Sequence, residues 1–139
     1  LHKEVFGPFS IVVQCQDKAE LVTVIQHLEG QLTGTILGTE TEIKTSPEVV
    51  SALVNRVGRI IFNGVPTGVE VCPSMMHGGP FPSTTDSRFT SVGTSAIRRW
   101  VRPVSFQSWP EEILPDALKN NNPLDIMRLV NGEHSKQKI

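Results

Sequence analysis

The chain has 139 residues, 38% of them hydrophobic and 19% charged, with a net charge of -1. This length suits a single domain, and the composition is that of a globular chain rather than a disordered one. A near-neutral charge offers no general field for nucleic acid or an anionic membrane, and no apolar run reaches the roughly 20 residues that span a bilayer.

The cysteine content and the first residues bear on the compartment. Cys15 and Cys72 are too few for a disulfide framework, and they lack the spacing of a metal finger. Residues 1–4 do not show the basic, apolar and small-residue pattern of a signal peptide. We therefore expect a cytoplasmic protein. The first residue is not Met and the opening resembles interior sequence, so we expect the chain to begin partway along a longer protein.

The first elements expected are a strand and a helix. Residues 9–15 are apolar and β-branched at successive positions, which predicts a strand buried on both faces. Asp17 offers an N-cap, and Glu20 lies at the spacing of a capping box. Apolar residues then recur at helical spacing, which predicts a helix that ends at Gly30.

The same unit recurs in the next thirty residues. Residues 33–38 predict a second strand, and Ser46 followed by Pro47 is typical of a helix start. An apolar stripe predicts that this helix runs to Gly58, and residues 59–63 predict a third strand. The order predicts an α/β fold with a βαβαβ parallel sheet and right-handed crossovers.

Residues 64–86 break this alternation. Much of the chain's glycine and proline falls here. Long loops in compact domains are usually functional or disordered, and the apolar residues within this one argue against a solvated linker. We expect an ordered loop that lines a site.

The remaining residues predict short elements. Residues 91–100 predict a short helix, and the alternation over 101–107, with one internal proline, predicts an edge strand. Two segments that start with proline, 110–114 and 123–130, each predict a short helix. The polar residues 133–139 predict a frayed end.

Cys72 and His77 raise the possibility of nucleophilic catalysis, with the thiolate as nucleophile and the imidazole as its base. A cysteine packed as a small apolar group beside a loop histidine is the favoured interpretation, since proximity in sequence shows no activation of the thiol. A zinc site that adds Asp86 is weaker still, because the usual ligand spacing is missing.

Other chemical motifs are weak or absent. The sequence contains no glycine-rich phosphate loop and no G-x-S-x-G nucleophile elbow. Arg98, Arg99 and Arg102 could bind an anion, although a solvated face or a subunit contact is favoured.

Residues 4–8, Glu-Val-Phe-Gly-Pro, precede the first predicted strand. The Glu4 carboxylate could accept hydrogen bonds from the adjacent hydroxyls of a ribose, and Phe6 could lie against a flat heterocycle. On these residues alone, a plain surface turn is the favoured interpretation.

The Glu-Val-Phe-Gly-Pro segment, followed by the predicted strand–helix–strand–helix–strand order, resembles the later part of the catalytic domain of aldehyde dehydrogenases. The middle of the chain is similar to one branch of that family, the NADP-preferring 2-oxoglutarate semialdehyde (2,5-dioxopentanoate) dehydrogenases and related fatty aldehyde dehydrogenases. The resemblance covers residues 1 to about 130, and its most specific segments are 63–72, 76–80, 85–88, 90–93 and 102–107.

The resemblance implies that the chain holds no catalytic residue. In the family, the nucleophilic cysteine, the general-base glutamate and the oxyanion-hole asparagine all precede the Glu-Val-Phe-Gly-Pro segment, so neither Cys15 nor Cys72 is the nucleophile. Glu4 matches the glutamate that holds the nicotinamide ribose, and Phe6 matches the aromatic beside the nicotinamide. The implied cofactor is NADP, with NAD as the alternative.

The resemblance also implies a substrate wall and an assembly surface. Val69, Val71 and His77 fall in the loop that lines the aldehyde tunnel, although many relatives have Phe where this chain has His77. Residues 101–107 match a strand that joins a sheet of a neighbouring subunit, which implies a homo-oligomer.

The expected organisation is a catalytic-domain part over residues 1–92 and an assembly strand with a helical tail over 93–139. The expected partners are an aldehyde substrate and the upstream part of the same enzyme. A non-catalytic binding module of the same architecture and a long-chain fatty aldehyde dehydrogenase remain as alternatives.

Overall fold

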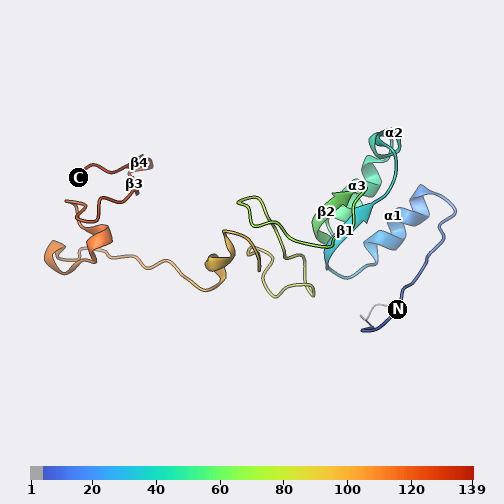
Figure 1. The fold of residues 1–139 in the computed structure, drawn as a ribbon, viewed down its shortest axis with the longest axis horizontal. Coiled ribbons are helices and arrows are strands. Elements are labelled where there is room, and N and C mark those ends of the chain that lie inside the picture. Colours follow the sequence, from blue (N-terminus) through green and yellow to red (C-terminus); the bar gives the residue numbers. More distant parts are fainter. Residues whose placement is uncertain (1–4) are drawn as a thin grey trace. The chain divides into compact units, whose positions relative to one another are not determined.

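The computed structural model describes residues 5–139, and the chain divides between Val101 and Arg102 into two compact units (Figure 1). The first unit carries a small α/β layer, and the second carries a short hairpin. None of the helices over residues 5–139 is long and apolar enough to cross a bilayer.

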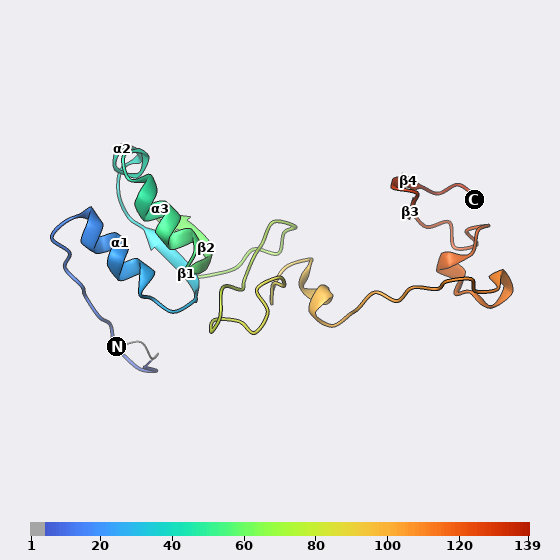
Figure 2. The same ribbon diagram turned by 180° about the vertical axis from the view of Figure 1, so that it is seen from behind.

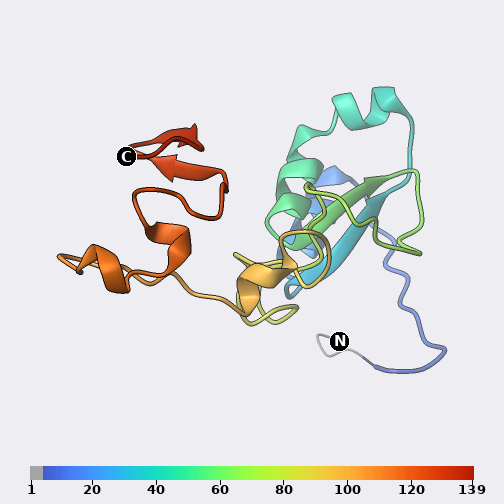
Figure 3. The same ribbon diagram turned by 60° about the vertical axis from the view of Figure 1, so that its left-hand side comes forward.

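The first unit is built on a two-stranded parallel sheet. Its elements are α1 (Lys18–Gln26), β1 (Gln31–Ile36), α2 (Glu40–Lys44), α3 (Pro47–Val54), β2 (Val57–Phe62) and the 3-10 helix η1 (Ala96–Arg99). β1 and β2 lie side by side, in a register that pairs Gln31 with Val57 and Ile36 with Phe62 (Figure 3). The β1–α2–α3–β2 crossover therefore confirms the second half of the predicted parallel fold.

The core of this unit lies between helices and sheet. α1 packs against α3, and α3 packs against β2 (Figure 2). The buried apolar residues are Ile25, Ala52, Leu53 and Val57. Leu53 fits over Gly34 of β1, where an added Cβ would come within 2.9 Å of the leucine Cδ1. The apolar stripes predicted on the two helices are thus the faces that meet.

The helix starts follow the capping residues, but the predicted helix ends are wrong. Asp17 caps α1 by accepting the Glu20 N–H at 2.9 Å, and the Glu20 carboxylate accepts the Gln16 N–H at 2.6 Å. α1 ends at Gln26 rather than at Gly30, and Gly58 lies inside β2 rather than at a helix end. Both glycines instead allow close backbone packing, as described for the loop below.

The short helix α2 was not predicted. Its start is a complete capping box in which the Thr39 hydroxyl accepts the Glu42 N–H and the Glu42 carboxylate accepts the Thr39 N–H at 2.7 Å. The Thr39-x-x-Glu42 spacing was the available signal. These bonds lower the pKa of Glu42, the largest cause being the Thr39 backbone N–H.

The strand predicted over residues 9–15 is wrong for this chain. These residues are irregular, and Val12 is 91% exposed. A strand buried on both faces needs neighbours to pair with and layers to cover it, and within residues 5–139 this segment has neither. The sheet therefore has two strands where the βαβαβ pattern predicted three.

The second unit holds 3-10 turns and an antiparallel hairpin. Its elements are η2 (Glu111–Ile113), η3 (Asp116–Leu118), β3 (Arg128–Val130) and β4 (Glu133–Ser135) (Figure 3). The helix predicted over 123–130 and the frayed end predicted over 133–139 are wrong. The reason is the turn between them: Asn131 and Gly132 have φ of 51° and 90°, the left-handed pair that favours a two-residue hairpin.

Two polar side chains organise this unit. Asn122 is buried, and its side-chain amide donates to the carbonyls of Ile126 and Lys136 at 3.0 and 2.8 Å. The Arg128 guanidinium donates to three backbone carbonyls: Lys119, Asn120 and Gln137. These bonds tie the hairpin to the turns before it, since buried polar groups need partners.

The predicted helix over 91–100 reduces to the single turn of η1, and the one over 110–114 to that of η2. Residues 101–107 are irregular and exposed, and they pair with no strand within residues 5–139. Their pairing with a neighbouring subunit stays a prediction.

Candidate substrate-loop site

The candidate site is the segment from Asn63 to Ser95, here called the substrate loop. The loop begins directly after β2. Its first residue, Asn63, is hydrogen-bonded to Gly38, which follows β1. The Asn63 side-chain amide donates to the Gly38 carbonyl at 2.7 Å, and its oxygen accepts the Gly38 N–H at 2.9 Å. Asn63 itself has φ of 50°, a conformation that asparagine tolerates better than most residues. The loop therefore leaves the sheet from a fixed point.

The loop returns to the opposite end of the sheet through backbone-to-backbone contacts. The Gly78 carbonyl lies against Gly58, and the Pro80 carbonyl lies against Gly30. Gly79 similarly lies against the backbone of Gln31, the first residue of β1. Any side chain at these glycines would overlap the facing backbone, so the glycines fix how closely the loop approaches.

The backbone of His77 is the best-anchored point of the loop. Its N–H donates to the Thr90 hydroxyl at 2.8 Å, and its carbonyl accepts the Ser91 N–H and hydroxyl at 2.9 and 2.6 Å. Thr90 is 3% exposed and donates in turn to the Val92 carbonyl at 2.6 Å. Nδ1 of the His77 ring is buried without a hydrogen-bond partner among the described residues. The site thus holds an imidazole nitrogen with unused hydrogen-bonding capacity.

The other two predicted wall residues lie in the outer part of the loop. Val69 is half-buried and Val71 is 73% exposed. Arg59 of β2 reaches this part, and its Nη1 donates to the Gly68 carbonyl at 3.0 Å. Sequence reasoning missed Arg59, although a lone cation at the start of an apolar strand was a visible signal.

A local ion pair between Asp86 and Arg88 lies in the later part of the loop. The Arg88 guanidinium donates to both carboxylate oxygens of Asp86, with the closest contact at 2.6 Å from Nη2 to Oδ2. These bonds lower the pKa of Asp86 to about 2, the Arg88 side chain being the largest cause. Arg88 therefore stabilises the charged form of the Asp86 carboxylate.

The structure does not support thiol chemistry at Cys72. The Cys72 Sγ lies 3.4 Å from the Ser74 hydroxyl, and no hydrogen bond joins it to the His77 ring in the part of the chain described. Across residues 5–139 no three acidic, histidine or cysteine side chains lie close enough together to hold a metal ion.

The predicted cofactor residues are only partly described. Glu4 lies outside the described residues. Phe6 is 94% exposed, so its ring is free to lie against a flat partner. Arg98 and Arg102 are also exposed, and neither forms an ion pair within residues 5–139.

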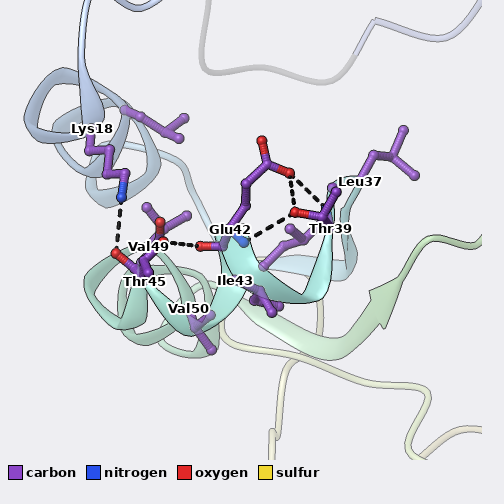
Figure 4. A pocket seen from close by; sticks show the side chains of 12 residues that line it. Lys18, Leu37, Thr39, Glu42, Ile43, Thr45, Val49 and Val50 are labelled. Carbon is purple, nitrogen blue, oxygen red and sulfur yellow. Dashed lines mark hydrogen bonds between the residues drawn. The ribbon is translucent and has the colours of Figure 1, made fainter.

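A separate cavity of about 270 Å³ lies among α1, α2, α3 and the end of β1 (Figure 4). Its lining is largely apolar, including Ile43, Val49 and Val50. Its two charged side chains are already engaged: Glu42 in the capping box and Lys18 with the Thr45 carbonyl at 2.9 Å. With its charges used to hold the helices, this cavity shows no group poised for chemistry.

Comparison with known proteins relates the chain to one kind of enzyme. The chain is 53% identical over 132 residues, or 95% of its length, to an alpha-ketoglutaric semialdehyde dehydrogenase of Acinetobacter baylyi. It is 46% identical over 130 residues, or 94% of its length, to alpha-ketoglutaric semialdehyde dehydrogenase 2 of Azospirillum brasilense. The chain is a homologue of these dehydrogenases. No family model matches it.

The chain spans about a quarter of the semialdehyde dehydrogenases that it matches, 25% in each case. Because the match covers 132 of the 139 residues, it includes the substrate loop whichever residue the match starts from. The resemblance drawn from the loop motifs is therefore confirmed. Neither relative is named as a fatty aldehyde dehydrogenase or as a non-catalytic module.

Proposed function

We propose that this chain forms the C-terminal quarter of a dehydrogenase that oxidises 2-oxoglutarate semialdehyde (2,5-dioxopentanoate) to 2-oxoglutarate with NADP. The observation that carries the proposal is the identity of 53% and 46% to two semialdehyde dehydrogenases over nearly the whole chain. Identity at this level across a loop of specific sequence supports a shared substrate as well as a shared fold.

In the proposed enzyme the chain binds and positions, and the groups that make and break bonds lie outside it. NADP, when bound, accepts the hydride removed from the aldehyde carbon. Glu4 holds the nicotinamide ribose hydroxyls, and Phe6 lies beside the nicotinamide. The high exposure of Phe6 supports this role, since its ring is not used within the first unit.

The substrate loop forms one wall of the aldehyde tunnel through Val69, Val71 and His77. Valine side chains exclude water from the reacting carbon. The unpartnered Nδ1 of His77 supports a polar contact with the substrate, because a buried ring nitrogen without a partner is stabilised by one.

Residues 101–107 provide the assembly surface, adding a strand to a sheet of a second subunit in the cytoplasmic homo-oligomer. Their exposure and irregular backbone support this role, because an unpaired segment with exposed valines gains hydrogen bonds and burial on pairing.

A chimera tests the proposal. The matching quarter of the Acinetobacter enzyme is replaced by this chain, and reduction of NADP is followed with 2-oxoglutarate semialdehyde. The proposal predicts turnover near that of the parent enzyme. A folded chimera of the parent's oligomeric state that oxidises other aldehydes but not this one would contradict the proposed substrate.

A further inference from the structure

The outer part of the substrate loop makes few contacts of its own. Val65 and Val71 are 75% and 73% exposed, and a Cβ placed on Gly68 would meet no atom within 4 Å. The backbone hydrogen bonds here are local, from Thr67 to Val65 and from Cys72 to Glu70. Apart from the half-buried Val69, neither burial nor local bonding therefore holds residues 65–71 against the sheet.

Arg59 supplies the missing restraint. Its side chain leaves β2, donates from Nη1 to the Gly68 carbonyl at 3.0 Å, and brings the same nitrogen to 4.0 Å from the Met75 Sδ. Within residues 5–139 these are the side-chain bonds that join the two strands to residues 64–76. The strand register fixes Arg59, which pairs with Thr33 of β1, so the tether starts from a rigid base.

The environment of Arg59 sets it apart from a surface arginine. Its Nε is buried without a hydrogen-bond partner, and no carboxylate lies within ion-pair distance among the described residues. A half-buried cation is costly without polar partners, and the bond to the loop carbonyl is the short hydrogen bond that its side chain makes. The carbonyl that it holds belongs to the residue before Val69.

We propose that Arg59 is a positioning residue that fixes the substrate loop at Gly68 and thereby sets the preference for the long semialdehyde. The inference rests on the proposed function of the loop as a tunnel wall. Arg59 touches no reacting atom in this account. Its effect passes through Val69, whose distance from the substrate depends on where the Gly68 carbonyl is held.

The test uses R59M and R59K in the active chimera. R59M keeps the apolar stem and removes the donors, and it is expected to raise KM for 2-oxoglutarate semialdehyde about tenfold, with kcat within about twofold. KM for NADP and for propanal, which is too short to need the outer loop, is expected to stay within about twofold. R59K can still donate to the Gly68 carbonyl and is expected to recover most of the loss.

Hydrogen exchange separates failure of this inference from failure of the proposed function. In R59M, amides of residues 64–71 are expected to exchange faster while those of β1 and β2 are unchanged, whatever the chimera oxidises. Unchanged loop exchange in R59M overturns the tether. Faster loop exchange with equal rises in KM for both aldehydes overturns the role in selectivity. If R59M does not fold, R59Q, whose side chain is too short to reach the Gly68 carbonyl from β2, takes its place: faster exchange in residues 64–71 supports the tether, and unchanged exchange there overturns it.

Discussion

The carbonyl oxygen of Gly78 lies against the backbone of Gly58, so a Cβ at Gly58 would overlap it. This contact joins the returning substrate loop to β2. We expect G58A to destabilise the chain by about 1–3 kcal/mol, because the added methyl group would meet the Gly78 backbone, which cannot move aside as a flexible side chain can. Urea unfolding measures the change. The matched control is G68A, because a Cβ added at Gly68 would meet no atom within 4 Å. For this variant we expect little change in the free energy of unfolding, or a slight increase. Equal stability of the two variants would contradict the packing described.

The hairpin turn of the second unit gives a second prediction. Gly132 has φ of 90°, in the region that disfavours side chains, whereas Asn131 at 51° tolerates replacement by glycine. We expect G132A to weaken the hairpin by about 1–2 kcal/mol and N131G to have little effect. Hydrogen exchange at the β3–β4 amides measures this, and equal protection in both variants would count against the turn geometry.

Asp86 gives a prediction on pH. Its folded-state pKa is lowered to about 2 from an ordinary value of about 3.9, with Arg88 as the main cause. Because the shift is downward, the stabilisation is present above about pH 4 and is lost as the pH falls toward 2. We expect the Asp86 carboxyl carbon to titrate near 2 by NMR, and at a higher pH in R88Q, where the N–H of residue 88 still donates to the carboxylate. Identical midpoints would show that the pair does not form.

Glu4 tests the cofactor assignment. In the chimera we expect E4Q to lower kcat with the semialdehyde about tenfold or more, since the amide holds the ribose hydroxyls less well than the carboxylate. The control, E112Q, changes an exposed glutamate in the second unit and should leave turnover unchanged. Turnover and NADP affinity that are unaltered by E4Q would rule out the ribose role.

The 139-residue chain by itself should not reduce NADP with any aldehyde, because the proposed nucleophile, base and oxyanion donors lie elsewhere in the enzyme. Cofactor reduction by the purified chain, followed by absorbance, tests this. Measurable turnover that is lost on alkylation of Cys72 would instead support the thiol-enzyme hypothesis.

Local signals in the sequence predicted the parts of the fold that depend on local physics. Asp17 starts α1, Ser46 and Pro47 start α3, and the parallel pairing of β1 with β2 follows from the crossover between them. Where a residue's role depends on distant partners, the prediction failed. Gly30 and Gly58 serve as contact points for the loop rather than as helix ends.

The candidate site divides in the same way. The loop motifs predicted which proteins the chain resembles. That Val69, Val71 and His77 form a wall of the substrate tunnel stays a prediction. The motifs did not predict Arg59, whose role depends on a contact with a carbonyl nine residues away. The strand predicted over residues 9–15 is wrong because its apolar pattern is typical of a strand covered by other layers, and residues 5–139 provide no such layers around it.

The most direct measurement is kcat/KM of the chimera for 2-oxoglutarate semialdehyde with NADP, compared with the parent Acinetobacter enzyme. We predict a value within about tenfold of the parent, since substitutions that keep the wall and the cofactor contacts cost little transition-state stabilisation. A chimera that folds and assembles like the parent but falls more than about a thousandfold below it would contradict the proposed function.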